Sequence, residues 1–358
     1  MLWGALGPGR AFAQRAAGLG LLGNHESPYC VAASGGASQC TICPRRCVIG
    51  PGERGWCRVR ENRGGKLTSL AYGNPCAVNV DPVEKKPFFH VLPGTRSFSV
   101  ATAGCNFDCK FCQNFEISQA RPDETFNQDL SPEAVVEQAR KYACRSVAST
   151  YVEPTVFLEY MIDIGRAARP LGLLNTMHSN GYMNPAPLED LCRVLDAACI
   201  DLKGFTESYY RDITEGTLAP VLETLKILKK NKVHTEIVNL MLPGKNDGED
   251  EVRAMCRFIR DELTPDTPLH FTRFYPLYKL RSLEPTPLAT LEKARGIALS
   301  EGLSFVYIGN VPGNPAENTV CPQCRADLIK RAGFMSRVVG LDGGKCARCG
   351  RPIPGIWV

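Results

Sequence analysis

Three cysteines with the spacing Cys-x3-Cys-x2-Cys constrain this chain more than any other feature of its sequence. Cys105, Cys109 and Cys112 directly follow an alternating, strand-like run at residues 97–104. A cluster of four irons normally takes four cysteine thiolates, so three cysteines leave one iron open to a ligand that is not protein. An open iron can bind and reductively cleave a cofactor. The alternatives are zinc with a fourth ligand elsewhere and ordinary thiols, but Phe111 before the last cysteine favours the cluster.

Two groups of four cysteines flank this motif among the 17 cysteines of the 358-residue chain. They are Cys40, Cys43, Cys47 and Cys57, and Cys321, Cys324, Cys346 and Cys349. Cys-x2-Cys spacings in a long chain indicate metal sites rather than a disulfide framework, and available thiolates imply a reducing compartment. The first group suits zinc or an auxiliary iron–sulfur cluster, with reduced thiols as the alternative. The second closely approaches the spacing of a zinc ribbon, with a second cluster as the alternative.

From residue 97 onward, strand-like and helix-like segments alternate. The strand-like segments are 97–103, 146–151, 174–179, 197–202, 234–242, 269–274 and 304–308. Helical periodicity lies at 155–169, 187–195, 219–231, 249–263 and 288–301, and a further helix begins at Ser131-Pro132, an N-cap followed by a proline. This alternation predicts right-handed βαβ units and a parallel sheet. Six or seven repeats favour an α/β fold built as an incomplete, partly open barrel of the (β/α)6 type, with functional residues at the C-terminal strand ends.

Polar residues recur where these strands end. Glu153 follows the second strand, where it can hold an ammonium group or serve only as an acid at a helix N-terminus. Asp201 and Lys203 alternate onto one face of the fourth strand, where they can orient ribose or carboxylate groups or form a mutual salt bridge. Asn180 ends the third strand, and Asn239 lies in the fifth. The recurrence predicts an active-site rim.

Composition and charge exclude some other classes. A net charge of +5 does not by itself indicate nucleic-acid binding, and the sequence has no run of about 18 apolar residues that would predict a membrane span. The N-terminal residues include Arg10 and Arg15 with no acid before Glu26, which is compatible with organellar targeting or with a cytoplasmic protein. The predicted organisation is a flexible extension at 1–30, a cysteine-rich metal-binding cap at 31–96, a core barrel at 97–314 and a zinc-ribbon-like segment at 315–358.

These motifs resemble those of the radical S-adenosylmethionine (SAM) enzymes, whose signature is Cys-x3-Cys-x-aromatic-Cys. Tyr-x-Glu-Pro-Thr at 151–155, Asn-Gly at 180–181, Asp-Leu-Lys at 201–203 and Pro-Gly-x-Asn-Asp at 243–247 are similar to the branch containing pyruvate formate-lyase activating enzyme. Roughly residues 38–358 also resemble the radical SAM enzyme of the AmmeMemoRadiSam system. The segments that carry this second resemblance are 81–87, 112–114, 201–203, 274–276, 307–310 and the two terminal cysteine groups.

The resemblance implies a radical SAM enzyme. Its catalytic residues Cys105, Cys109 and Cys112 would hold a [4Fe-4S] cluster, and SAM would be cleaved reductively to methionine and a 5′-deoxyadenosyl radical that abstracts hydrogen from an unidentified substrate. By position, Phe111 would pack near the adenine and Glu153 would meet the methionine amine. The full set of expected cofactor-binding residues is Phe111, Glu153, Asn180, Asp201, Lys203 and Asn239.

Three functions remain in competition. The preferred one is hydrogen abstraction from a substrate other than a glycyl-radical enzyme, with Memo-like and AMMECR-domain proteins as partners. The second is an activase that installs a glycyl radical on a partner protein; it is less favoured because the smallest activases lack the terminal cysteine groups. Both need a reductant such as flavodoxin or ferredoxin. The third is a non-enzymatic zinc-binding scaffold, which is expected to have lost cluster cysteines, whereas all three are present.

Overall fold

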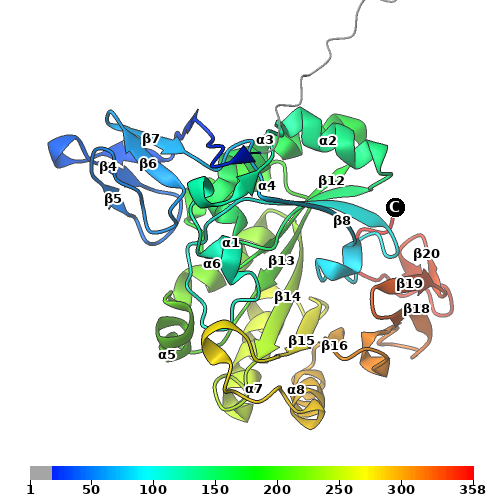
Figure 1. Ribbon diagram of the computed structural model, residues 1–358. Coiled ribbons are helices and arrows are strands. Elements are labelled where there is room, and N and C mark those ends of the chain that lie inside the picture. The colour runs from blue at the N-terminus through cyan, green and yellow to red at the C-terminus, as the bar shows by residue number, and fades with distance from the viewer. Residues whose placement is uncertain (1–17) are drawn as a thin grey trace, which may run out of the picture.

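The computed structural model describes residues 18–358 (Figure 1), so residues 1–17 of the predicted N-terminal extension lie outside the described residues. Within the described part, β1 (Gly18–Leu19) pairs with β10 (Phe126–Asn127), and β2 (His25–Glu26) pairs with β7 (Lys66–Ser69). Part of the predicted extension is therefore paired with other strands. The partner strands β10 and β7 lie further along the chain, so no pattern within this stretch predicts the pairing.

An eight-stranded sheet forms the centre of the molecule, in the order β16-β15-β14-β13-β12-β11-β9-β8. Its strands are β8 (Ala77–Pro82), β9 (Arg96–Ala101), β11 (Ser146–Ser149), β12 (Leu174–Ser179), β13 (Ala197–Asp201), β14 (His234–Met241), β15 (Leu269–Arg273) and β16 (Val306–Gly309). All pair in parallel except β8, which runs antiparallel beside β9. The α/β fold with a mostly parallel sheet is thereby confirmed, and β8 is an addition to it.

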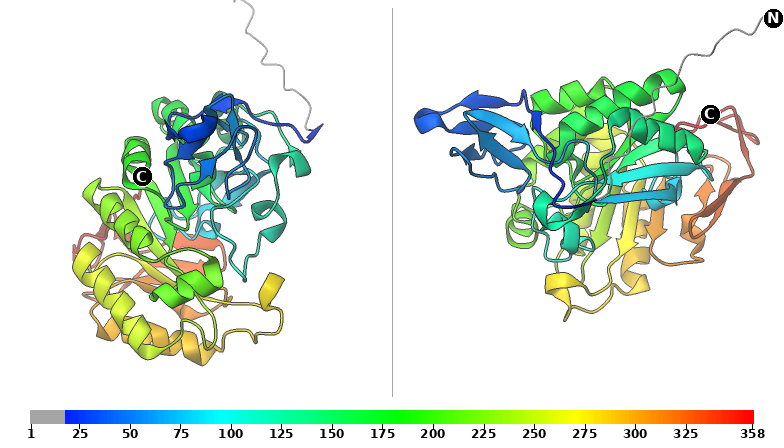
Figure 2. Two further views of the ribbon diagram at one scale, coloured as in Figure 1. Left: turned by 90° about the vertical axis from the view of Figure 1, so that its left-hand side faces the viewer. Right: turned by 45° about the horizontal axis from the view of Figure 1, so that its top comes forward.

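Helices connect successive parallel strands. They are α1 (Phe115–Ser118), α2 (Pro132–Lys141), α3 (Leu158–Ala168), α4 (Pro185–Cys192), α5 (Glu207–Tyr209), α6 (Ala219–Lys230), α7 (Glu249–Phe258) and α8 (Leu288–Ser300). The predicted N-cap is present, since Ser131 Oγ accepts a hydrogen bond from Ala134 N at 3.2 Å. The strand order never reverses, so right-handed crossovers place the main connecting helices on one face of the sheet (Figure 2).

The loop after β8 folds back against the opposite, inner face of the sheet. Its buried residues Val83, Phe88 and Val91 pack against Cys199 of β13 and Val238 of β14. The loop therefore fills the part of the inner face near the beginning of these strands and leaves the other part, at the C-terminal strand ends, available for a site.

The C-terminal segment follows β16 and reaches this same loop. It contains β17 (Thr319–Val320), β18 (Asp327–Ala332), β19 (Met335–Val338), β20 (Leu341–Asp342) and β21 (Lys345–Cys346). Ile356 N donates to His90 O at 2.8 Å, and Leu92 N donates to Ile356 O at 2.7 Å. The sheet edges β8 and β16 are thus bridged by the chain that follows each of them (Figure 1).

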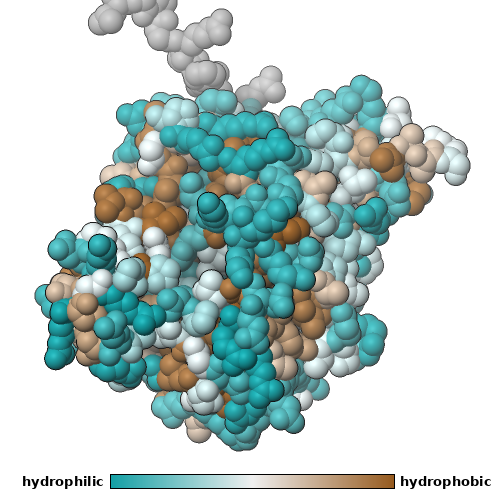
Figure 3. Space-filling model, turned by 180° about the vertical axis from the view of Figure 1, so that it is seen from behind, coloured by the Kyte–Doolittle hydropathy of each residue, from teal (hydrophilic) through white to brown (hydrophobic). Residues whose placement is uncertain are grey.

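The N-terminal cap projects from the opposite side of the sheet (Figure 1). It contains β3 (Cys30–Ala32), β4 (Ser38–Cys40), β5 (Val48–Ile49) and β6 (Arg60–Arg63), together with β2 and β7. A buried ion pair attaches it to α3, with Arg60 Nη1 2.5 Å from Glu159 Oε1. Val31 and Val48 are exposed on the cap, where Figure 3 shows hydrophobic residues at the upper right. The predicted cap boundary at residue 96 is too late, because β8 belongs to the central sheet.

Within residues 18–358, no helix is long and apolar enough to cross a membrane.

Candidate functional site

A cavity of about 780 Å³ lies on the inner face of the sheet, where the parallel strands end. Cys105, Cys109 and Cys112 line one side of it. Five of the six residues predicted to bind the cofactor line it as well: Phe111, Glu153, Asn180, Asp201 and Lys203. Because the carboxyl ends of parallel strands meet at one edge of a sheet, residues far apart in sequence share one chamber.

Asn239 is the exception. Its Nδ2 donates to Leu202 O at 2.8 Å and lies 3.8 Å from Met255 Sδ of α7, whereas its neighbours Val238 and Leu240 line the cavity. Side chains alternate between the two faces of a strand, so a residue between two cavity-lining positions faces the helices. The expectation that Asn239 contacts the cofactor is therefore corrected.

The loop after β9 presents the three cysteines. Gly104 opens it with a φ of 93°, a conformation that favours glycine. Phe107 N donates to Cys105 Sγ at 3.4 Å, and Cys112 Sγ lies 3.3 Å from Ser118 Oγ. Burial raises the pKa of Cys109 to about 12 and the pKa of Cys105 well above its ordinary value. Free thiols here are protonated at neutral pH, so a positively charged metal centre is what would hold them as thiolates.

The number of cysteines in this loop fits a cluster with an open iron. A [4Fe-4S] cluster normally takes four thiolates, each on a different iron. Cys105, Cys109 and Cys112 supply three, so one iron would keep a position for a ligand that is not protein. Among residues 18–358, the group of cysteines that already stands at the spacing of a single ion is the C-terminal one, with its sulfurs within 4.8 Å of one another.

Glu153 is buried at the end of β11 and ties it to the end of β12. Its Oε1 accepts hydrogen bonds from Thr155 N at 3.0 Å and Ser179 Oγ at 2.7 Å, and its Oε2 accepts one from Asn180 N at 2.7 Å. Burial raises the pKa of this carboxyl above its ordinary value despite these donors. A carboxylate has about four acceptor positions, so Oε2 keeps one position for a donor in the cavity.

Asp201 lies between two cationic or ionisable partners. Its Oδ1 is 2.9 Å from His178 Nε2, and its Oδ2 is 2.8 Å from Lys203 Nζ. Burial opposes ionisation, but Lys203 and His178 hold the pKa of Asp201 well below its ordinary value. Lys203 Nζ also lies 5.4 Å from the centre of the Phe111 ring. The sequence left open whether Asp201 and Lys203 form a mutual salt bridge or orient a ligand. In the structure the two residues form the salt bridge and also line the cavity.

The far side of the cavity is built by segments outside the parallel strands. Glu84 and Phe89 come from the loop after β8, and Glu317 and Phe334 come from the C-terminal segment. Glu84 Oε1 accepts a hydrogen bond from Gly94 N at 2.7 Å, while its Oε2 is buried without a partner. Glu84, Glu317 and Phe334 are not among the predicted site residues, because they do not follow the ends of the parallel strands.

The C-terminal cysteines form a compact tetrad. The Sγ atoms of Cys321 and Cys349 are 3.6 Å apart, and those of Cys324 and Cys346 are also 3.6 Å apart. These separations match the spacing of roughly 3.8 Å that one tetrahedral ion requires. The tetrad is therefore a candidate metal site, as the spacing in the sequence predicted.

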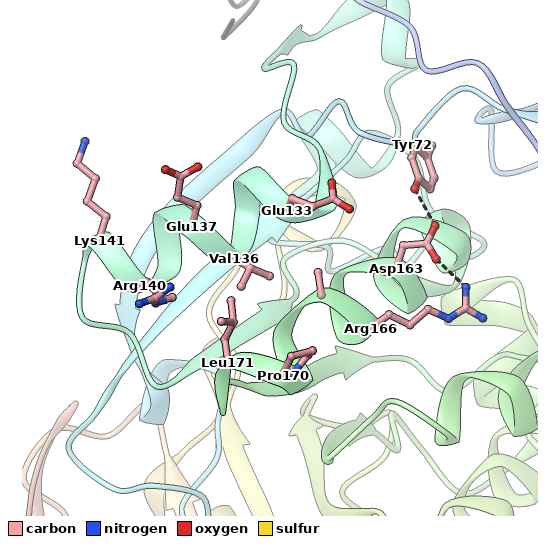
Figure 4. Close-up of a pocket in the computed structure, with 11 residues that line it drawn as sticks. Tyr72, Glu133, Val136, Glu137, Arg140, Lys141, Asp163, Arg166, Pro170 and Leu171 are labelled. Atoms are coloured by element: carbon pink, nitrogen blue, oxygen red, sulfur yellow. Dashed lines mark hydrogen bonds and ion pairs between the residues drawn. The ribbon is translucent and has the colours of Figure 1, made fainter. Parts of the chain in front are cut away.

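A second hollow lies on the outer helical layer, between α2 and α3 (Figure 4). Asp163 accepts from Tyr72 Oη at 2.7 Å and Arg166 Nη1 at 2.8 Å, so its polar groups satisfy one another. It contains no cysteine and lies on the face of the sheet opposite the cavity.

Comparisons with known proteins agree with this geometry. The family described as the radical SAM superfamily matches residues 99–259. The uncharacterized protein MJ0808 of Methanocaldococcus jannaschii is 47% identical over 317 residues, which cover 88% of this chain and 94% of that protein. Pyruvate formate-lyase 1-activating enzyme of Escherichia coli K12 is 25% identical over 229 residues, which cover 60% of this chain and 93% of that enzyme.

A solved structure, a radical SAM methyltransferase from Sphaerobacter thermophilus, aligns with a TM-score of 0.48 at 13% identity, over 60% of this chain and 66% of that one. The sequence matches cover the cysteine loop and most of the strand ends that form the cavity. The chain belongs to the radical SAM superfamily of enzymes, and within it is similar to pyruvate formate-lyase activating enzymes.

Proposed function

We propose that this protein uses a [4Fe-4S] cluster held by Cys105, Cys109 and Cys112 to cleave SAM reductively. Bound there, the cluster supplies one electron that splits SAM into methionine and a 5′-deoxyadenosyl radical, which takes hydrogen from a substrate. The observation that carries the proposal is that the three cysteines share one cavity with the buried carboxylate of Glu153 and the half-buried carboxylate of Asp201.

The chain's own residues bind and orient the cofactor. Glu153 Oε2 would accept a hydrogen bond from the methionine ammonium, because a carboxylate–ammonium hydrogen bond is among the strong ones. Phe111 would pack against the adenine. Asp201, held by Lys203 and His178, would orient the ribose hydroxyls. Asn180 Nδ2 donates to Asn106 Oδ1 at 2.8 Å, so it fixes the cysteine loop from the neighbouring strand end.

The substrate binds on the far side of the same cavity. That wall includes Glu84, Phe89 and Phe334, all outside the residues 99–259 that match the family. A wall made by segments outside the family match supports a substrate different from a glycyl-radical enzyme, in line with the resemblance to the AmmeMemoRadiSam enzyme and its Memo-like and AMMECR-domain partners. A flavodoxin or ferredoxin is the expected reductant, and zinc is the expected ion of the C-terminal tetrad.

The second candidate is a glycyl-radical activase. The observation that favours it is the similarity to the E. coli activating enzyme over nearly that enzyme's whole length. Co-purification separates the two, since an activase retains a glycyl-radical enzyme, whereas the first hypothesis expects Memo-like or AMMECR-domain proteins.

Anaerobic reconstitution with iron and sulfide tests the shared chemistry. The reduced protein should release 5′-deoxyadenosine from SAM, and a Cys109→Ala variant should release none. Cys192→Ala is the matched control, because Cys192 is a half-buried thiol of α4 outside the cavity. SAM cleavage by the Cys109→Ala variant would overturn the proposed cluster ligands, and no cleavage by the unsubstituted protein would overturn the proposal and favour the zinc-binding scaffold.

A further inference from the structure

The four cysteines of the cap, Cys40, Cys43, Cys47 and Cys57, lie close together in two neighbouring turns. Cys40 N donates to Cys47 O at 2.9 Å, which closes the loop that carries Cys43. Cys57 lies in the turn before β6, and a Cβ added at Gly55 in that turn would lie 3.7 Å from Cys47 Sγ. Cys40 is buried in the hydrophobic core, and Cys43, Cys47 and Cys57 pack against that core. The four thiols therefore form one group.

The C-terminal tetrad has all four sulfurs within 4.8 Å of one another, which is the spacing of a single ion. Among residues 18–358, the cap cysteines are not part of this group. The metal of the cap group is therefore indicated by what surrounds its cysteines.

Two buried arginine donors without partners lie in the same stretch of chain as Cys57. Arg58 Nη1 and Arg60 Nε are both sealed from solvent and make no hydrogen bond. The rest of the Arg60 guanidinium is paired with Glu159, yet Cys40 and Cys57 are also among the groups that raise its pKa. Buried N–H groups are rarely left unpaired, so the unpaired donors point to a missing acceptor, such as the sulfurs of an anionic cluster.

The cap contacts the loop that carries Cys105, Cys109 and Cys112, and it does so on both sides of Cys105. A Cβ added at Gly104 would lie 2.4 Å from Cys57 O, so the two backbones are in direct contact. On the other side, Arg45 Nε, from the loop between Cys43 and Cys47, donates to Asn106 O at 2.7 Å. The cysteine-bearing turns of the cap therefore contact the residues immediately before and after a ligand of the first cluster.

We infer that Cys40, Cys43, Cys47 and Cys57 bind a second iron–sulfur cluster that passes electrons to the SAM site. An external low-potential reductant of the flavodoxin or ferredoxin class gives one electron to the oxidised cap cluster. The reduced cap cluster then gives that electron to the cluster at Cys105, Cys109 and Cys112 and returns to its oxidised state. The identity of the electron acceptor rests on the proposed function, whereas the presence of the cap cluster does not.

The first test counts iron in the full-length chain. A variant with Cys105→Ala, Cys109→Ala and Cys112→Ala should keep about half the iron and sulfide of the unsubstituted protein after reconstitution, because one of two clusters remains. It should also give an iron–sulfur EPR signal on reduction with dithionite. Adding Cys43→Ala and Cys57→Ala should remove that remainder. Zinc, or no metal, in the cap of the triple variant would overturn the inference.

Folding of each variant is checked by zinc retained at the C-terminal tetrad. If a variant loses that zinc, the unsubstituted protein is measured instead. Its Mössbauer spectra and iron content should show two clusters, and a single cluster would refute the inference. These readouts do not need SAM cleavage, so they remain valid if the proposed function fails.

The second test addresses electron transfer. With a flavodoxin-type donor, a Cys43→Ala and Cys57→Ala variant that retains the first cluster should release 5′-deoxyadenosine at least tenfold more slowly than the unsubstituted protein. An unchanged rate with that donor would refute the relay.

Discussion

The carboxylate of Glu153 accepts a hydrogen bond from the backbone nitrogen of Asn180 at 2.7 Å, across two neighbouring strand ends. The Glu153 carboxylate thus holds the ends of β11 and β12 together at the rim of the cavity, and it also contributes a carboxyl group to that rim. A Glu153→Gln substitution replaces one acceptor oxygen by a donor that cannot pair with Ser179 or Asn180 in the same way.

We expect Glu153→Gln to weaken SAM binding at least tenfold and to lower the free energy of unfolding by about 1–3 kcal/mol, the usual cost of an unsatisfied buried group. Isothermal titration with SAM and urea unfolding measure the two effects. Glu137→Gln, on the exposed side of α2, is the control. SAM affinity equal to that of the control would contradict this role.

Because the amine of Lys86 is buried, we expect the free energy of unfolding to rise in alkaline solution. Burial lowers its pKa to about 8, against the opposing effect of Asp81, whose Oδ2 lies 2.5 Å away. Between pH 8 and about 10 the unfolded chain still binds a proton that the folded chain has released, so stability rises with pH. The expected gain is roughly 1–3 kcal/mol.

Urea unfolding at several pH values checks this prediction. The stability of the unsubstituted protein relative to Lys86→Met should increase between pH 8 and 10. Lys141→Met, at an exposed position of α2, should keep the unsubstituted profile. Parallel profiles for all three proteins would show that Lys86 stays charged when folded.

The Arg60–Glu159 pair predicts strong coupling between the cap and α3. Arg60→Met leaves Glu159 as a buried, unpaired charge, which typically costs about 3–5 kcal/mol. The double variant Arg60→Met/Glu159→Met should be less destabilised than the single one, because no charge remains buried. A double-mutant cycle by urea unfolding measures the coupling, and additive effects would speak against it.

Metal removal from the C-terminal tetrad should loosen the far wall of the cavity. Cys346→Ser should release the bound ion and make the exposed Lys330 in β18 accessible to trypsin, while the iron content stays unchanged. Elemental analysis and limited proteolysis provide the readout, with Cys192→Ser as the control. Unaltered proteolysis would mean that the segment is ordered without its ion.

The parallel sheet could be predicted because each of its strands is a short buried run between helices, as in residues 174–179, where the prediction and β12 coincide. β8 was missed because it is an edge strand whose middle residues, Asn79 and Val80, are exposed, so it lacks an apolar pattern. Its partner, β9, is close in sequence, but antiparallel pairing across the intervening loop has no signature in the alternation of strands and helices.

The site residues that line the cavity were predicted from two properties, a reactive or polar side chain and a position at the end of a strand. Asn239 shows what happens when only the first property is used. It was chosen for its polar side chain, although the alternation along β14 assigns Val238 and Leu240 to the cavity face. The part of the far wall that comes from the C-terminal segment, with Glu317 and Phe334, could not be predicted. Arg331 Nη2 donates to Phe89 O at 2.7 Å, and such a contact between distant segments has no local sequence pattern.

The bond between His90 and Ile356 also sets an order of events during synthesis. The cysteine loop leaves the ribosome long before residue 356, and domains begin folding from the N-terminal side as they are made. The hydrogen bonds that join the loop after β8 to the segment after β16 cannot form before residue 356 has been made. The loop that carries the cysteines is therefore complete before this side of the cavity can be.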